Sequence, residues 1–207
     1  MKYGLLVKKV HFDGKRYATA EEIGEICRMA GITYKNGINY LIRTKHLVRV
    51  LKGFFYIKTL EERKAGASNA NFFEAVARAL EHKGVRWYFG FDTAVKLNNL
   101  THEYFATDCI VSDRIFRSRS VAILGHNVRF IKLKKGLFGF GIISRGGINY
   151  SDIEKTLLDI AYIRKYRGIG DSSIRDETAD LLGHANRKKL REYGRHYPLS
   201  VRRAYGL

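Results

Sequence analysis

The clearest pattern of apolar and polar positions lies in residues 19–57. Apolar side chains recur there at the spacing of one helix face, at Ile23, Ile26, Cys27 and Ala30. Thr19 and Glu22 have the spacing of a capping box, in which each side chain bonds the other residue's backbone amide. Gly31 follows the last apolar position, where glycine commonly ends a helix. The pattern therefore predicts a helix over about residues 20–30.

A second helix is predicted after a very short turn, with Thr33 as its cap. Its apolar face consists of Tyr34, Ile38, Leu41 and Ile42. Gly37 lies inside this helix at a cost of about 1 kcal/mol relative to alanine. A close approach of DNA, or of the preceding helix, would explain that glycine. Residues 47–51 and 54–57 are rich in β-branched and aromatic side chains, so a hairpin is expected there.

The first domain is predicted to be a winged helix-turn-helix over residues 1–60. Residues 1–10 have the composition of a short helix and residues 16–18 of a short strand. The order helix, strand, helix, helix, hairpin is that of a winged helix, in which the hairpin is the wing. Residues 61–71 are small and polar and are expected to form a linker.

The second domain, over residues 72–207, is predicted to mix helices with a mainly antiparallel sheet and to end in a helical tail. Helices are expected at 72–83, at 92–100 with Asp92 as the cap, and after Ser151 and Glu154, which form a second candidate capping box. Strands are expected at 85–91, 106–111, 121–124, 128–133 and 139–143, and tail helices at 172–182, 187–193 and 200–207. The predicted fold class is α+β.

The outward face of the second helix suggests contact with DNA. It carries Lys35, Asn36, Asn39 and Arg43, the side-chain types that read base edges and bind phosphates in a major groove. Tyr40, Lys45, Arg49 and Lys52 extend this candidate set toward the wing. Two other interpretations stay open: any surface helix shows polar residues opposite an apolar face, and some winged helices bind protein.

Charge favours a polyanionic partner. The formal net charge is +18, and residues 1–60 hold 12 Lys and Arg against 4 Asp and Glu. A second basic cluster follows near the end of the chain, at Arg187, Lys188, Lys189, Arg191, Arg195, Arg202 and Arg203. That cluster is either a solvated helix face or a further contact with DNA, RNA or an acidic partner.

Other chemistry is sparse in the sequence. Cys27 and Cys109 show neither a disulfide framework nor a zinc spacing, which fits a reducing cytoplasm. Neither a signal peptide nor a membrane-spanning stretch is expected. The seven histidines show no metal-ligand spacing, so no metal or cofactor is predicted. Residues 136–141 are glycine-rich, but the Lys-Ser/Thr of a phosphate-binding loop is missing.

Residues 151–160 (SDIEKTLLDI) have a structural interpretation of their own. Ser151 and Glu154 cap a helix, and Lys155 and Asp159, four residues apart, pair along its surface for a few tenths of a kcal/mol. The alternative is a site for a partner or a nucleotide.

Three segments together resemble the AbiEi family of antitoxin regulators from type IV toxin–antitoxin and abortive-infection systems. They are residues 88–101 (YFGFDTAVKLNNLT), the motif Ser151, Glu154, Lys155 and Asp159 within residues 151–160, and residues 200–207 (SVRRAYGL). The resemblance implies an N-terminal winged helix and a C-terminal antitoxin domain. It also implies repression of the protein's own operon and opposition to a nucleotidyltransferase-like toxin, without requiring a stable complex with it.

The sequence favours a regulator over an enzyme. A nuclease set of Asp108, Asp113, Glu154 and Lys155 is the enzymatic alternative, in which carboxylates hold Mg²⁺ and the lysine positions water. The spacing of these residues fits no nuclease motif, and the paired aspartates of a nucleotidyltransferase are missing. RNA binding is the third hypothesis. Because operators often contain two half-sites, a dimer or cooperative binding to double-stranded DNA is expected.

Overall fold

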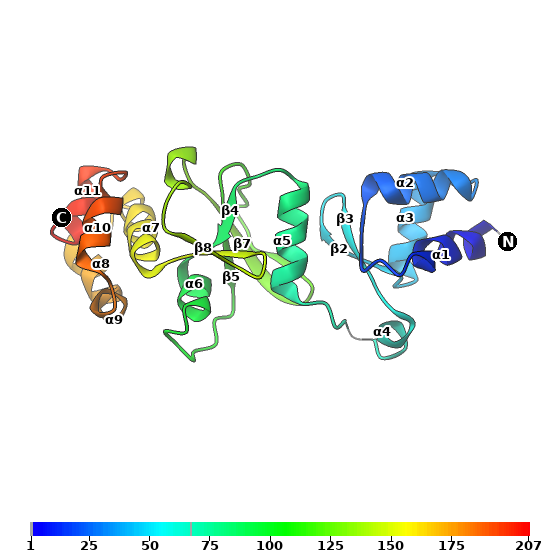
Figure 1. Ribbon diagram of the computed structural model, residues 1–207, viewed down its shortest axis with the longest axis horizontal. Helices are drawn as coiled ribbons and strands as arrows, with labels where there is room; N and C mark the ends of the chain where they lie inside the picture. The colour runs from blue at the N-terminus through cyan, green and yellow to red at the C-terminus, as the bar shows by residue number, and fades with distance from the viewer. Residues whose placement is uncertain (1, 67) are drawn as a thin grey trace. The chain divides into compact units, whose positions relative to one another are not determined.

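The computed structural model describes residues 2–66 and 68–207, and it combines helices with two β-sheets (Figure 1). The α+β class is therefore confirmed. The chain divides into two compact units. The N-terminal unit comprises Met1–Lys83 and Ala122–His126, and the C-terminal unit comprises Gly84–Val121 and Asn127–Leu207. This division differs from the expected boundary at residue 71, because the helix that begins at Phe72 belongs to the N-terminal unit.

The N-terminal unit packs helices on a small antiparallel sheet. Its elements are α1 (Lys2–Phe12), β1 (Tyr17–Thr19), α2 (Ala20–Met29), α3 (Tyr34–Arg43), β2 (Leu47–Leu51), β3 (Phe54–Ile57), α4 (Leu60–Lys64) and α5 (Phe72–His82). The strands lie in the order β1-β3-β2. The shared core of α1, α2, α3 and the sheet includes Leu6, Ile23, Cys27, Leu41 and Phe55. The helices and the hairpin expected in residues 19–57 are thus confirmed.

The ends of α2 follow the sequence signals closely. The Thr19 side chain accepts from the Glu22 amide, and the Glu22 carboxylate accepts from the Thr19 amide at 2.8 Å. Gly31 has a φ of +64°, which L side chains rarely adopt. Thr33 stands at the N-cap of α3 as expected, but its side chain makes no capping hydrogen bond.

The expected linker begins with a short capped helix. Thr59 and Glu62 form a capping box at the start of α4. Glu62 is buried, and its carboxylate also accepts from the Tyr56 hydroxyl at 2.6 Å and from the Asn69 amide at 2.6 Å. The carboxylate therefore fixes this segment to the sheet, because three donors satisfy it away from water.

The C-terminal unit contains a larger sheet and a group of helices. Its elements are β4 (Trp87–Phe89), α6 (Phe91–Leu97), β5 (Asp108–Ser112), β7 (His126–Lys132), a 3-10 turn (Lys135–Leu137), β8 (Ile142–Arg145), β9 (Ile148–Ser151), α7 (Ile153–Tyr166), α8 (Asp171–Glu177), α9 (Ala179–Gly183), α10 (Arg187–Gly194) and α11 (Leu199–Ala204). Strand β6 (Val121–Ile123) has its first residue in this unit and its other two in the N-terminal unit. Helices α9, α10 and α11 contact α7, and α8 contacts α11 (Figure 1). Within the described part of the chain, no helix is both long and apolar enough to cross a membrane.

The larger sheet is mixed, so the expected mainly antiparallel sheet is confirmed only in part. Its strand order is β6-β7-β5-β4-β9-β8. The pairs β4–β5 and β8–β9 are antiparallel, whereas β5–β7 and β4–β9 are parallel. The parallel pairing of β9 with β4 was not expected, because β9 itself was not predicted and the two strands lie far apart in the sequence.

Two predicted helix starts also differ. Gly90, not Asp92, is the N-cap of α6, and Asp92 lies in its first turn. Asp152, not Ser151, is the N-cap of α7, where its carboxylate accepts from the Lys155 amide at 2.9 Å. Ser151 is the last residue of β9, so the predicted capping box of Ser151 and Glu154 is wrong.

Candidate nucleic-acid interface

Helix α3 presents a polar face to solvent. Lys35, Asn36, Asn39 and Arg43 are all exposed, whereas Ile38 and Leu41 are buried in the core of the N-terminal unit. Since residues three and four apart share one side of a helix, these four side chains form a continuous stripe of donors and acceptors. The stripe contains two cations and two amides, and it contains no carboxylate.

The apolar face of α3 packs very closely on α2. Gly37 is buried, and a Cβ added to it would clash with Sγ of Cys27 and would lie 3.6 Å from Leu6 Cδ2. The glycine in mid-helix is therefore explained by the approach of α2, one of the two reasons expected from the sequence. This contact fixes α3 against the rest of the unit, and so fixes the direction in which its polar stripe faces.

Of the remaining predicted contact residues, Tyr40 lies within α3, and the other three follow α3 or lie on the hairpin. Lys45 is exposed with a φ of +60°, and Arg49 is exposed on β2 with its guanidinium 5.9 Å from the centre of the Phe55 ring. Lys52 is exposed in the turn between β2 and β3. Tyr40 differs from the others, since it is half-buried and its ring packs against Tyr3 at 4.4 Å. Tyr40 is thus held by α1.

Two histidines of the N-terminal unit meet, although the sequence separates them widely. Nε2 of His11 lies 2.9 Å from Nδ1 of His46, which is buried. When both rings are neutral, one nitrogen can donate a proton to the other. When both rings are protonated, the two facing nitrogens are both donors and no hydrogen bond can form. Burial, with the charge of Arg63, lowers the pKa of His11, and burial lowers that of His46 to about 4.

This pair predicts a loss of stability in mild acid. Because the folded pKa of His46 lies below its usual 6.5, its contribution is complete above pH 6.5 and is lost as the pH falls toward 4. We expect about 2 kcal/mol to be lost by pH 5. Urea unfolding at pH 7.5 and pH 5 measures this change in the free energy of unfolding. In His46→Gln most of the difference between the two pH values should disappear. The exposed His102→Gln is the control, and an equal difference in both variants would contradict the assignment.

The C-terminal unit holds a buried ion pair where a surface pair was expected. Lys155 and Asp159 are both fully buried, with Nζ 3.2 Å from each carboxylate oxygen. The hydroxyls of Tyr88 and Tyr197 each donate to Asp159 at 2.7 Å. The rings of Tyr88 and Phe140 lie 4.8 and 5.0 Å from Lys155 Nζ. The surface interpretation is therefore wrong.

This buried cluster is closed to solvent and electrically balanced. Burial, followed by the charge of Asp159, raises the pKa of Tyr88 and of Tyr197, so both hydroxyls stay protonated donors. The carboxylate receives two hydroxyls and the ammonium, which satisfies the buried charge. Gly141, at φ +63°, lies directly over it, and a Cβ there would come within 2.7 Å of Lys155 Cβ. We therefore assign the cluster to the core of the unit.

The rest of the motif that resembles the AbiEi family is also buried, and its contacts lie within the unit. The Glu154 carboxylate accepts from the Asn186 amide at 2.7 Å and so connects α7 to the start of α10. The Ser151 hydroxyl lies 2.7 Å from that of Thr156. Asp152 also accepts from the Tyr193 hydroxyl at 3.2 Å. These contacts join α7 to β9 and α10.

The four residues of the nuclease hypothesis have separate neighbours. Asp113 accepts from the Arg86 amide, Asp108 accepts from the Thr93 hydroxyl, and Glu154 and Lys155 make the contacts described above. Within the described residues, no three His, Cys, Asp or Glu side chains come together as a metal site would require. Cys27 and Cys109 are buried free thiols, and burial raises the pKa of both.

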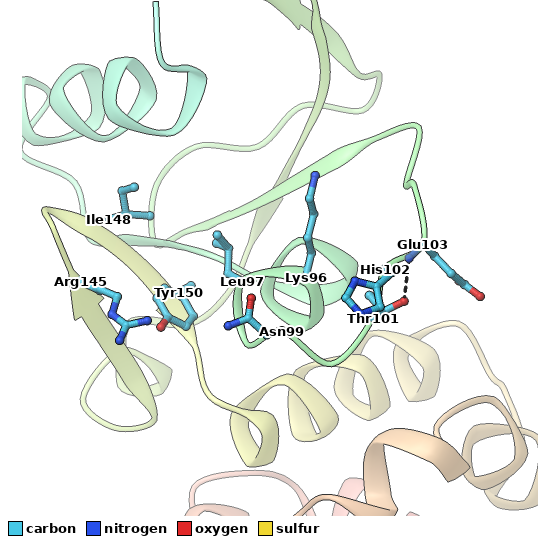
Figure 2. Close-up of a pocket in the computed structure, with 9 residues that line it drawn as sticks. All are labelled: Lys96, Leu97, Asn99, Thr101, His102, Glu103, Arg145, Ile148 and Tyr150. Carbon is cyan, nitrogen blue, oxygen red and sulfur yellow. Dashed lines mark hydrogen bonds between the residues drawn. The ribbon is translucent and has the colours of Figure 1, made fainter.

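A cavity of about 480 Å³ lies beside β8 and β9 in the C-terminal unit (Figure 2). Arg145 and Tyr150 lie on one side, and Lys96, His102 and Glu103 on the other. The only hydrogen bond drawn joins the Glu103 amide to the Thr101 hydroxyl, at 3.0 Å. The cationic groups point in different directions, as side chains on an open surface do.

Comparison with known proteins gives a fold likeness and no family. The protein is of the α+β class, and neither a family model nor a curated protein sequence matches it. Among solved structures it is similar to the RV2827C protein from Mycobacterium tuberculosis. The TM-score is 0.63 at 14% identity, over 98% of this chain and 74% of that chain. At this identity the likeness concerns the fold alone.

Proposed function

We propose that this protein is a DNA-binding transcriptional regulator that uses its N-terminal unit as a winged helix-turn-helix. In this proposal α3 enters the major groove of double-stranded DNA, and the β2–β3 hairpin contacts the neighbouring phosphates. The observation that carries it is the exposed stripe of Lys35, Asn36, Asn39 and Arg43 on a helix whose other face is buried. Arginine and asparagine at such positions pair with guanine and adenine edges.

Charge and charge placement support the proposal. The net charge is +18, and an excess of this size attracts polyanions over distances near the Debye length. Lys52 and Arg49 place cations on the hairpin, where a wing would meet the backbone. Binding of two half-sites would require a dimer or cooperative binding.

The resemblance of three segments to antitoxin regulators supports a second role for the same protein. We propose that the C-terminal unit opposes a nucleotidyltransferase-like toxin encoded in the same operon, with or without direct binding. The buried motif around Lys155 would then maintain the fold of the unit, and its exposed surface would act on the toxin or on the toxin's target. Rescue of growth when this protein is co-expressed with such a neighbouring gene would support this role, and failure to rescue would contradict it.

Substitutions on α3 and on the hairpin should have different effects on DNA binding. We expect Arg43→Ala to weaken binding to DNA from the protein's own promoter by about 1–3 kcal/mol and to relax base preference. Lys52→Ala should weaken binding to all duplexes alike. It should also reduce the slope of log affinity against log salt concentration by about 1, the amount expected for one lost phosphate contact. Titration of a promoter duplex and a scrambled duplex at two salt concentrations separates the two effects. If both variants bind as the parent does, the proposed interface is wrong.

A further inference from the structure

A groove on the C-terminal unit combines arginine side chains with exposed aromatic rings. It lies between the C-terminal half of α7, strands β5 and β7, and residues 116–118, and its volume is about 720 Å³. Sites that hold small molecules have volumes of about 300–1,000 Å³. We propose that this groove binds unpaired nucleotides of a nucleic-acid strand, separately from the duplex contact proposed for α3.

The groove is built on one face of the sheet. Strands β5 and β7 run parallel with Cys109 opposite Arg129 and Val111 opposite Ile131, so these residues share a face. Ile160 and Ile163 of α7 complete the apolar part of the lining. Residues 116–118 are held at the rim, where the Arg117 amide donates to the Phe130 carbonyl at 3.4 Å. Apolar lining of this kind suits the flat face of a base.

The rim carries cations that lack partners. Arg117, Arg129 and Arg167 are exposed, and within the described part of the chain their guanidinium groups have no ion pair or hydrogen bond. A guanidinium binds phosphate with two parallel hydrogen bonds, and it is more weakly hydrated than an ammonium group. The three arginines therefore present donors with the geometry that a phosphate backbone needs.

The groove also contains two carboxylates, which do not cancel this charge. Glu177 is engaged by Arg164 through both Nε and Nη2. Asp92 is the other carboxylate, and its pKa is raised first by burial and then by the charge of Glu177. Of the two carboxylates in the lining, Asp92 is therefore the one that Arg164 does not engage through hydrogen bonds.

Two large aromatic rings lie at the rim without a packing partner. Phe116 is 65% exposed and Tyr166 is 89% exposed, and among the described residues no other ring stacks on either. Aromatic side chains bind bases by stacking, and every base offers a face for this contact. The base faces of a duplex are already covered by their neighbours. Exposed rings beside free arginines therefore favour unpaired nucleotides over duplex DNA.

Binding of short labelled oligonucleotides to the full chain tests the proposal. Unstructured RNA and DNA of about eight nucleotides should both bind at about 50 mM salt. Tyr166→Ala should weaken binding about fivefold or more, and Tyr166→Phe, which keeps the ring, should stay within about twofold of the parent. The double variant Arg129→Ala with Arg167→Ala should also bind more weakly. Its slope of log affinity against log salt concentration should fall by about 0.7 for each phosphate that it no longer neutralises. The exposed Arg145→Ala, on β8 outside the groove, is the charge control.

The results show whether the groove prefers RNA or DNA, and whether it binds nucleotides at all. Equal binding of RNA and DNA would support recognition through base faces and phosphates, and preference for RNA would add the 2′-hydroxyl. Absence of binding of both oligonucleotides would overturn the proposal, as would equal binding by the parent, Tyr166→Ala and the arginine double variant. Because Arg43→Ala leaves the groove intact, loss of duplex binding in that variant tests the proposed function separately.

Discussion

Lys155→Ala is expected to lower the free energy of unfolding by about 3–5 kcal/mol. The substitution removes the cation and leaves the Asp159 carboxylate fully buried, with only the hydroxyls of Tyr88 and Tyr197 as donors. It also leaves a space among Tyr88, Phe140 and Tyr197, whose rings surround Nζ. Asp159→Ala should cost a similar amount, since it leaves the ammonium group without its anion. Urea unfolding of the full chain measures both.

Two controls distinguish a buried charge from a general loss of packing. The double variant Lys155→Met with Asp159→Leu removes both charges, keeps most of the volume, and is expected to be closer to the parent than either single alanine variant. Arg78→Ala breaks a pair of the same spacing that is exposed, Arg78 with Glu74 at 2.8 Å, and should cost less than about 1 kcal/mol. Equal effects of Lys155→Ala and Arg78→Ala would refute the burial of the first pair.

Gly37→Ala is expected to destabilise the N-terminal unit by about 1–3 kcal/mol, although alanine is the better helix former by about 1 kcal/mol. The added Cβ clashes with Cys27 Sγ, and both residues lie in a packed core that cannot yield easily. Because α3 would have to shift away from α2, binding of promoter DNA should weaken as well. Urea unfolding and duplex titration measure the two effects.

Removal of the sulfur should rescue this variant. In the Gly37→Ala background, Cys27→Ala should restore about 1 kcal/mol or more, although Cys27→Ala in the parent destabilises. Gly24→Ala on α2 is the matched control, since its Cβ would meet nothing closer than Tyr34 Cδ2 at 3.9 Å. That substitution should be neutral or stabilising by up to about 1 kcal/mol. If Gly37→Ala behaves like Gly24→Ala, the close packing of α2 on α3 is wrong.

Local signals predicted local structure well. Thr19 with Glu22, the αL glycine at Gly31, and the hairpin around Lys52 depend on contacts between residues close in sequence, and each is present. The same Thr-x-x-Glu signal occurs at Thr59, but the polar composition of residues 61–71 indicates a linker and conceals the short helix. The capping signal at Thr59 and Glu62 therefore predicts this helix better than the overall composition of the segment does.

Long-range contacts account for the errors. The spacing of Lys155 and Asp159 indicated that they pair, but their burial depends on Tyr88 and Tyr197, which are 71 and 38 residues from Asp159. The mixed sheet has the same cause, since β9 pairs with β4 across a long stretch of chain. His11 and His46 meet through the packing of α1, which their separation of 35 residues conceals. No pattern within a short window contains this information.

The exposed face of α3 was predicted, but exposure alone does not establish DNA contact. The structure adds a reason for its orientation, because Gly37 fixes the helix on α2 and leaves Lys35, Asn39 and Arg43 outside. The groove of the C-terminal unit was not predicted. Its members come from six separated segments, and only the fold brings Arg117, Arg129 and Arg167 together.

The most direct test of the central claim is a titration of duplex DNA from the protein's own promoter with the parent, Arg43→Ala and Arg28→Ala. Arg28 is the matched control, since it is exposed on α2 of the same unit and carries the same charge outside the α3 stripe. We expect Arg43→Ala to lose about 5- to 150-fold in affinity for this duplex but much less for a scrambled duplex, whereas Arg28→Ala stays within about twofold of the parent on both. Equal affinity of all three proteins for the promoter duplex would contradict DNA recognition by α3.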